Sequence, residues 1–301
     1  MRLLMVRGCV AGVIVCLAIL ILKTAGQPAA SNAAAQSAPT TAPASQPAPP
    51  LVKLPAGGLS IVALGDSLTE GGGDESGKGY PGRLVALIQA VRPGSKITNL
   101  GKSGWTSENL IKGHDNQPSQ LKQAVAAKPQ LALVWIGSND LWYLYEYGNP
   151  DGTSARDEQD DLRKYRQNIE TIVRGLKEAG AVVVLALLDD QSKRPVAIKG
   201  EAFTGITKAE LGQMSKQAAA YNSILREVAA KLGVLTADIQ HTSIFTEAAT
   251  LSDDGNHPND KGYDAIAQVW FKAIAPALMP PQPRRPPGGP DASQPGARDK
   301  P

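Results

Sequence analysis

Cysteine is almost absent from this chain. The 301 residues include two cysteines, Cys9 and Cys16, and both lie in the first apolar stretch. The rest of the chain therefore cannot form a disulfide scaffold, a thiolate metal site or a site with a cysteine nucleophile. Histidine is also scarce, with three in the chain, so few side chains can act as an imidazole base.

The middle of the chain has no excess of positive charge, although the formal net charge of the whole chain is +3. The first 50 residues hold three basic residues and no acidic one, and residues 280–301 hold four basic and two acidic residues. Of the chain's 31 basic and 28 acidic residues, this leaves 24 basic and 26 acidic ones between Leu51 and Met279. The sequence therefore has no basic patch that would indicate a nucleic-acid partner.

The N-terminal segment has the pattern of an export signal. Arg2 and Arg7 precede an uncharged apolar run over residues 8–22, which Lys23 ends. A helix of that length would rise roughly 22 Å, which is short of the about 30 Å hydrocarbon core of a bilayer. We interpret residues 1–26 as a signal peptide or, alternatively, as an anchor that tethers the protein to a membrane. Either reading predicts an exported protein that is periplasmic, extracellular or membrane-anchored.

Two segments lack the residues that build a core. Residues 27–50 contain no charged or aromatic residue, and residues 280–301 are rich in proline. Such segments bury too little apolar surface to offset the entropy lost on ordering. We therefore predict a disordered linker at 27–50, a disordered tail at 280–301 and one domain over residues 51–279.

Short apolar runs alternate with segments of helical periodicity in this domain. The predicted strands are Leu59–Leu64, Lys96–Leu100, Gln130–Ile136, Ala181–Leu187 and Val234–Asp238. The predicted helices are Gly82–Val91, Ser119–Ala127, Asp160–Ala179, Lys208–Leu232 and Asp260–Leu278. Most of the strand runs are continuously apolar, as in strands covered on both faces. The alternation predicts an α/β fold with a doubly wound parallel sheet, in which functional sites gather at the carboxyl ends of the strands.

A serine follows the first predicted strand directly, in the segment Gly65–Gly71 (GDSLTEG). On a turn from strand to helix, the Ser67 hydroxyl would lie at the carboxyl edge of the sheet. The start of the helix would favour developing negative charge there, which suits a nucleophile that attacks a carbonyl. The alternative is that Ser67 or Asp66 only caps the helix.

The next two predicted strands end in a glycine-rich turn and in an asparagine. Gly101 and Gly104 allow a backbone N–H to approach a ligand, or they form a tight turn. Asn139, in the segment Gly137–Asp140, can donate its side-chain N–H to an oxyanion. Asp140 is expected to cap the following helix.

An aspartate and a histidine lie three residues apart before the last predicted helix, at Asp254 and His257. A serine nucleophile needs an imidazole that takes its proton and a carboxylate that orients the imidazole. His114 is a rival base, but its loop has no comparable position at a strand end. We expect His241, after the fifth strand, to pack rather than to line the site.

These residues together resemble the motifs of the SGNH (GDSL-type) hydrolase family, and the resemblance spans residues 59–278. It implies a three-layer α/β/α sandwich around a five-stranded parallel sheet, a flavodoxin-like arrangement. It also implies that Ser67 is the nucleophile, that His257 is the base and that Asp254 orients it. The backbone N–H groups of Ser67 and Gly104 and the side chain of Asn139 would form the oxyanion hole. No metal and no organic cofactor is implied.

The substrate is less well defined by the sequence. Residues 141–147 are the most aromatic stretch of the chain, so Trp142 and Tyr143 are candidates to line the substrate site, together with Trp105 and Asp66. The resemblance implies a serine esterase that acts through an acyl-enzyme on a small-molecule or polysaccharide ester, such as an acylated carbohydrate outside the cell. The alternatives are an O-acyltransferase, a lysophospholipase or thioesterase, and a non-catalytic binding module.

Two further residues raise the question of a metal. Asp189 and Asp190 follow the fourth predicted strand. We interpret this acidic pair as a polar loop with a helix cap rather than as a metal site.

Overall fold

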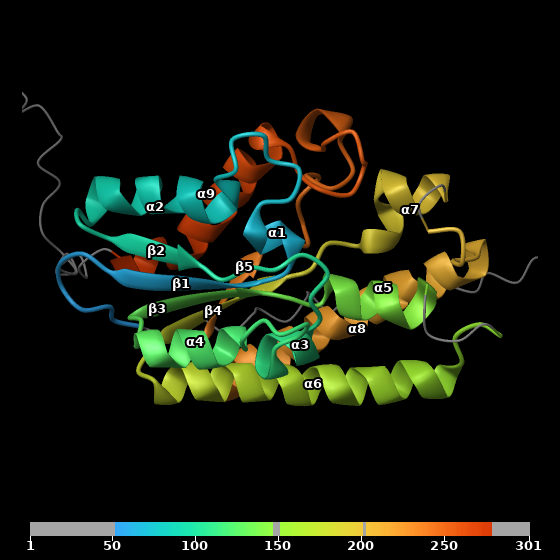
Figure 1. Ribbon diagram of the computed structural model, residues 1–301, viewed down its shortest axis with the longest axis horizontal. Helices are drawn as coiled ribbons and strands as arrows, with labels where there is room; N and C mark the ends of the chain where they lie inside the picture. Colours follow the sequence, from blue (N-terminus) through green and yellow to red (C-terminus); the bar gives the residue numbers. More distant parts are fainter. Residues whose placement is uncertain (1–51, 147–150, 201–202, 279–301) are drawn as a thin grey trace, which may run out of the picture. The chain divides into compact units, whose positions relative to one another are not determined.

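A sheet of five parallel strands forms the centre of the computed structural model, which describes residues 52–146, 151–200 and 203–278 (Figure 1). The predicted signal peptide or anchor at 1–26, including the apolar run 8–22, the predicted linker at 27–50 and the predicted tail at 280–301 lie outside the described residues. Among the helices of the described part, none is long and apolar enough to cross a membrane.

The five predicted strands are confirmed, each within one residue of its expected ends. They are β1 (Ser60–Gly65), β2 (Lys96–Asn99), β3 (Leu131–Trp135), β4 (Val182–Leu187) and β5 (Leu235–Asp238). Their order in the sheet is β2-β1-β3-β4-β5, and all four pairings are parallel. Every residue of β3 is buried, as is all of β1 except its first residue. This burial explains why these strands read as continuous apolar runs.

Helices cover both faces of the sheet (Figure 1). The short helix α1 (Ser67–Glu70) lies on one face with α2 (Gly79–Val91) and α9 (Asp260–Leu278). The other face carries α3 (Ser107–Lys112), α4 (Gln120–Ala127), α6 (Ala155–Glu178) and α8 (Lys208–Leu232). The α/β/α sandwich is therefore confirmed.

Two helices extend beyond the carboxyl ends of the strands, α5 (Ser138–Glu146) and α7 (Pro195–Lys199) (Figure 1). The five predicted helices are confirmed, but α6 begins five residues earlier than the sequence indicated. Its start is fixed by a capping box, in which Ser154 and Asp157 each accept a backbone N–H of the other. The short helices α3 and α7 were not predicted.

Candidate active site

Ser67 is the first residue of α1, immediately beyond β1. The helix cap is Asp66, whose side chain accepts the backbone N–H of Leu68 over 3.0 Å. Gly65 cannot carry a side chain, because a Cβ there would lie 2.2 Å from both the Thr69 Oγ1 and the Trp135 carbonyl oxygen. The capping role thus belongs to Asp66, and the Ser67 hydroxyl remains available for other contacts.

His257 bridges Ser67 and Asp254. Its Nε2 lies 2.9 Å from the Ser67 Oγ, and its Nδ1 lies 2.6 Å from one carboxylate oxygen of Asp254. The other Asp254 oxygen accepts the backbone N–H groups of Asn256 and His257, each over 2.8 Å. Partial burial acts to raise the pKa of Asp254, but these hydrogen bonds outweigh it and lower the pKa to about 2. Asp254 is therefore an anion at neutral pH.

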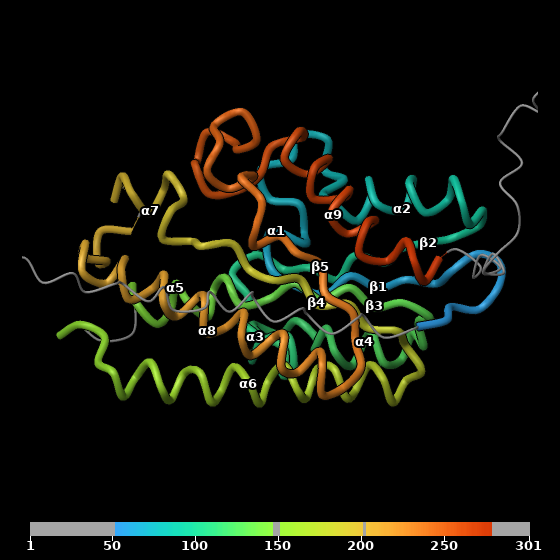
Figure 2. The backbone as a smooth tube through the Cα atoms, turned by 180° about the vertical axis from the view of Figure 1, so that it is seen from behind, coloured from blue at the N-terminus to red at the C-terminus, as the bar shows by residue number. Residues whose placement is uncertain are grey.

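The loop that holds this pair is not at a strand end. It comes well after Asp238, the last residue of β5, and directly before α9. In space it lies beside the turn that follows α1, as the orange and cyan segments of Figure 2 show. The contact is close, because a Cβ on Gly72 would lie 2.9 Å from the His257 Cδ2.

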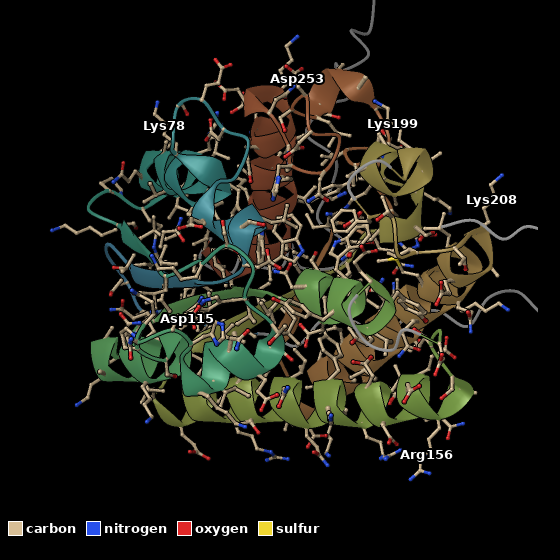
Figure 3. All side chains as sticks on the ribbon, turned by 45° about the vertical axis from the view of Figure 1, so that its right-hand side comes forward. Lys78, Asp115, Arg156, Lys199, Lys208 and Asp253 are labelled. Carbon is tan, nitrogen blue, oxygen red and sulfur yellow. The ribbon has the colours of Figure 1, made fainter. Side chains whose placement is uncertain are left out.

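The other two histidines do not contact Ser67. The His114 side chain is about half exposed and lies 3.2 Å from Asp115. Figure 3 shows Asp115 far from Asp253, the residue next to Asp254. The His241 side chain is 64% exposed and pairs with Asp238 at 2.8 Å, so our expectation that it packs was wrong.

The predicted oxyanion donors follow neighbouring strands. Ser67 follows β1, Gly104 comes after β2 and Asn139 comes after β3, and β1 lies between the other two strands in the sheet. Within the described residues, the backbone N–H groups of Ser67 and Gly104 donate to no protein acceptor. One N–H of the Asn139 side chain donates to the Trp105 carbonyl oxygen over 2.9 Å, which leaves its second N–H for a ligand.

Gly104 and Asp140 illustrate how the turns around these donors are built. Gly104 has φ +77°, a left-handed conformation that favours glycine. Asp140 lies inside the first turn of α5 and does not cap that helix as predicted. Its carboxylate accepts the Ser107 backbone N–H and hydroxyl at the start of α3, so it ties the two helices together.

Three of the four residues expected to line the substrate site are buried. Asp66, Trp105 and Trp142 are at most 5% exposed, whereas Tyr143 is half exposed. The Trp142 ring stacks on Phe203 with centroids 4.1 Å apart, because this side of α5 faces the interior. Of the four candidates for lining the substrate site, Tyr143 therefore presents the most surface to solvent, and Asp66, Trp105 and Trp142 present little.

Asp66 directly precedes Ser67 in the sequence and is buried. One of its carboxylate oxygens, Oδ2, has no hydrogen-bond partner among the described residues. Burial raises its pKa to about 7, against the lowering effects of the Leu68 N–H and the Arg194 charge.

The acidic pair after β4 is occupied by protein contacts. Asp189 forms a buried ion pair with Arg194. Asp190 accepts hydroxyl hydrogen bonds from Ser192 and Ser215 and lies 3.1 Å from the Lys193 ammonium group. Asp190 stands at the N-cap of the short 3-10 helix Gln191–Lys193, as predicted, but its side chain makes no capping hydrogen bond there. In the part of the chain that the structure describes, no group of three or more His, Cys, Asp or Glu side chains could hold a metal ion.

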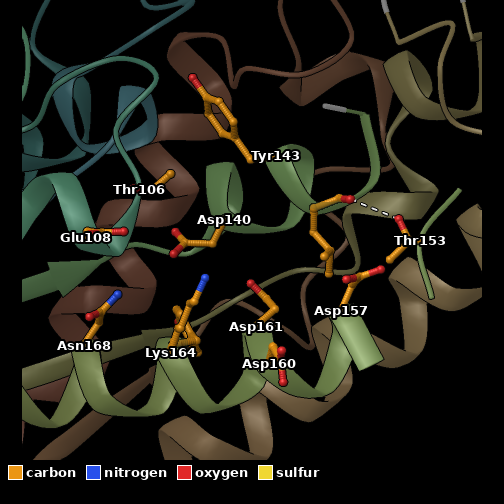
Figure 4. Close-up of a pocket in the computed structure, with 12 residues that line it drawn as sticks. Thr106, Glu108, Asp140, Tyr143, Thr153, Asp157, Asp160, Asp161, Lys164 and Asn168 are labelled. Atoms are coloured by element: carbon orange, nitrogen blue, oxygen red, sulfur yellow. Dashed lines mark hydrogen bonds between the residues drawn. The ribbon is translucent and has the colours of Figure 1, made fainter. Parts of the chain in front are cut away.

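A polar pocket of about 370 Å³ lies between α3, α5 and α6 (Figure 4). Thr106 and Asp140, which line it, follow Trp105 and Asn139 in the sequence. Figure 4 shows Lys164 of α6 pointing across the pocket toward Asp140 of α5. The pocket therefore lies behind the segments that carry the predicted oxyanion donors.

Comparison with known proteins places this arrangement in a family. The model of the GDSL-like lipase/acylhydrolase family matches residues 63–265, which is more than half of the chain and includes all the residues of the site. The chain belongs to this family. It is accordingly an ester hydrolase of the GDSL type.

One curated relative of this GDSL-type hydrolase is the acetylxylan esterase of Geobacillus stearothermophilus. It is 25% identical over 234 residues, which cover 72% of this chain and 94% of the relative. A crystal structure of an acetylxylan esterase from that organism has a TM-score of 0.51 at 23% identity, and covers 73% of this chain and 95% of its own. The α/β hydrolase LAE5 from the metagenome of Lake Arreo has a TM-score of 0.54 at 22% identity, over 75% of this chain and 98% of its own. These structural likenesses support the fold.

Sequence reasoning missed several hydrogen bonds beside the candidate site of this GDSL-type hydrolase. The buried side chain of Gln120 bonds both to the carbonyl oxygen of Gly65, over 2.8 Å, and to its N–H, over 2.9 Å. The Nη1 of Arg194 donates to the side-chain oxygen of Asn256, the residue before His257, over 2.8 Å. No short-range sequence signal could have found these contacts, because each joins residues more than 50 positions apart.

Proposed function

We propose that the protein is a serine esterase, with Ser67 as nucleophile, His257 as general base and Asp254 as the carboxylate that orients the base. The observation that carries this proposal is the pair of hydrogen bonds through His257, 2.9 Å to the Ser67 Oγ and 2.6 Å to the Asp254 carboxylate. A nucleophile within reach of a base that is itself oriented by an acid is the arrangement that acyl transfer requires.

The first half of the reaction forms an acyl-enzyme. The Ser67 oxygen attacks the ester carbonyl carbon while its proton passes to the Nε2 of His257, and the ionised Asp254 stabilises the imidazolium that results. The tetrahedral oxyanion accepts hydrogen bonds from the backbone N–H groups of Ser67 and Gly104 and from the second N–H of Asn139. Each such donor lowers the barrier by about 3 kcal/mol. The first half ends when the tetrahedral intermediate collapses and the imidazolium of His257 gives its proton to the departing alcohol, which leaves the acyl group on Ser67.

The second half releases the acid. The neutral imidazole then takes a proton from water, whose oxygen attacks the acyl carbon, and the Ser67 oxygen leaves with the proton from His257. Both steps use the same base and the same oxyanion donors, and neither requires a cofactor.

The proposed substrate is an acylated carbohydrate with a short acyl group. This part of the proposal is supported by the 25% identity to an acetylxylan esterase over 94% of that relative. A second, longer relative from Xylanibacter ruminicola, also 25% identical, is an acetylxylan esterase too. The apolar run at residues 8–22 supports an exported enzyme that meets such a substrate outside the cell.

Hydrolysis of p-nitrophenyl esters from acetyl to palmitoyl, and of acetylated xylo-oligosaccharides, tests the proposal with the full chain. We expect turnover that is greatest for acetyl and that disappears in Ser67→Ala. The matched control is Ser223→Ala, which removes an exposed hydroxyl on α8 that, among the described residues, bonds the Ala219 carbonyl oxygen. Equal turnover in wild type and Ser67→Ala would overturn the proposal. A maximum at long acyl chains would assign the activity to lipids, and transfer to an added sugar would indicate an acyltransferase.

A further inference from the structure

Arg194 is a buried cation close to the candidate active site but with no part in the proposed chemistry. Its side chain is 1% exposed, and it forms two hydrogen bonds to Asp189, 2.8 Å from Nε and 2.7 Å from Nη2. Its guanidinium carbon lies 4.3 Å from the ring centroid of Phe245. A buried ion pair gains little net stability because both ions lose their hydration.

The third nitrogen of the Arg194 guanidinium, Nη1, contacts the loop that carries His257. This nitrogen donates to the Asn256 side-chain oxygen over 2.8 Å, and Asn256 directly precedes His257. Two residues beyond Arg194, the Val196 backbone N–H donates to the Gly255 carbonyl oxygen over 3.1 Å. The segment 194–196 thus holds two successive residues of this loop.

The loop, defined here as residues 252–257, has its own internal hydrogen bonds. The Ser252 backbone N–H donates to the His257 carbonyl oxygen over 2.9 Å, and the Gly255 N–H donates to the Ser252 carbonyl oxygen over 3.0 Å. These bonds fix the shape of the loop. They do not fix its position relative to Ser67, which depends on contacts with other segments.

We propose that Arg194, clamped by Asp189, is a positioning residue that holds the 252–257 loop through Asn256 so that the His257 imidazole stays within hydrogen-bonding distance of Ser67. This inference rests on the proposed function of that pair. The planar guanidinium makes three directed bonds and stacks on Phe245 at the same time, which a lysine ammonium cannot do. The positioning role therefore depends on the shape of the side chain and not on its charge alone.

The test is a set of full-chain variants assayed for kcat and KM on p-nitrophenyl acetate. Asn256→Ala removes the contact while the buried ion pair stays intact, and we expect kcat to fall by roughly 10–100-fold with KM changed less than about twofold. Asn256→Asp keeps an acceptor oxygen for Arg194 and should restore most of kcat. Arg194→Lys should resemble Asn256→Ala, although the charge is retained.

The matched control is Asp253→Ala, in the same loop. Its side chain is exposed and points outward in Figure 3, so this variant should keep the wild-type kcat. A purely structural role for Arg194 would lower the melting temperature of Asn256→Ala without lowering kcat in the folded protein. That result would overturn the proposal, as would an equal loss in Asn256→Asp and Asn256→Ala.

The wild type and Ser67→Ala are measured alongside these variants. If wild-type turnover does not depend on Ser67, the proposed function fails. If turnover depends on Ser67 and Asn256→Ala keeps the wild-type kcat, the function stands and the positioning role is refuted.

Discussion

Ser67, Gly104 and Asn139 each follow a strand of the sheet, whereas Asp254 and His257 lie in a loop outside it. The strand ends are fixed by the backbone hydrogen bonds of the sheet. The loop has no strand to hold it and depends on a few contacts from neighbouring segments. We therefore expect the strand side of the site (Ser67, Gly104 and Asn139) to tolerate changes in its surroundings better than the loop side (Asp254 and His257).

A hydrogen bond between the Ser67 Oγ and the His257 Nε2 joins the strand side to the loop side. Removing either partner should have the largest effect of all. We expect Ser67→Ala and His257→Ala to lower kcat by roughly 10⁴–10⁶-fold, because the two groups act as a unit. The measurement is steady-state hydrolysis of p-nitrophenyl acetate, with circular dichroism to show that each variant is folded. An active His257→Ala variant would refute the assignment of the base.

The strand side can be weakened alone at Asn139. Asn139→Ala removes one proposed oxyanion donor, so kcat should fall by roughly 10²–10³-fold while KM changes little. Asn168→Ala is the control, because this asparagine lies on α6 and its side chain bonds the Ser107 hydroxyl rather than a predicted oxyanion position. A rise in KM with unchanged kcat would place Asn139 in substrate binding instead.

The loop side can be displaced without removing any functional group. A Cβ on Gly72 would lie 2.9 Å from the Cδ2 and 3.3 Å from the Nε2 of His257, so Gly72→Ala must move the ring. We expect kcat to fall by up to about 10²-fold, because misplacing a catalytic group by about 1 Å can cost this much. Gly212→Ala on α8 is the matched control, because a Cβ there meets nothing within 4 Å. Wild-type activity in Gly72→Ala would mean that the loop adjusts freely.

The buried carboxyl group of Asp66, next to Ser67 in the sequence, should make the stability of the fold depend on pH. Its pKa is raised to about 7 by burial, above the value of about 3.9 in an unfolded chain. Its contribution to stability is therefore fully present below about pH 4 and is lost as the pH rises through about 7. Asp66→Asn keeps the oxygen that caps α1 and cannot ionise, so the wild-type melting temperature should fall relative to this variant between about pH 4 and pH 7. Parallel melting curves would contradict this, and Asp253→Asn, exposed at the surface, is the control.

The smallest effects are expected at the two histidines outside the site. The side chains of His114 and His241 are more than half exposed. Among the acidic side chains of the described residues, each contacts one nearby aspartate, Asp115 for His114 and Asp238 for His241. His114→Ala and His241→Ala should each keep kcat/KM within about twofold of the wild-type value. A collapse of activity in His114→Ala would instead make it the base.

The strands and the reactive residues could be predicted because their signals are local. A strand covered on both faces is a continuous apolar run, and Asp254 lies three residues from His257, so both patterns can be read in a short window. The position of the loop side relative to Ser67 could not be predicted. It depends on Arg194 and Gly72, which contact the 252–257 loop only in the folded chain.

The sequence also could not predict which side chains around the site are buried. Trp142 and Tyr143 are adjacent and both aromatic, yet one is 4% and the other 50% exposed. The difference follows from the direction in which α5 presents each side chain to the interior. That direction is set by the packing of α5 against other helices and not by the aromatic pattern itself.

The central claim is that His257 activates Ser67, and covalent labelling tests it most directly. A fluorophosphonate reacts with an activated serine hydroxyl, as the oxygen–phosphorus bond forms and fluoride leaves. With the full chain, we predict one adduct, located on Ser67 by peptide mass spectrometry, absent in Ser67→Ala and formed far more slowly in His257→Ala. Labelling of another serine, or an equal rate in His257→Ala, would contradict the account.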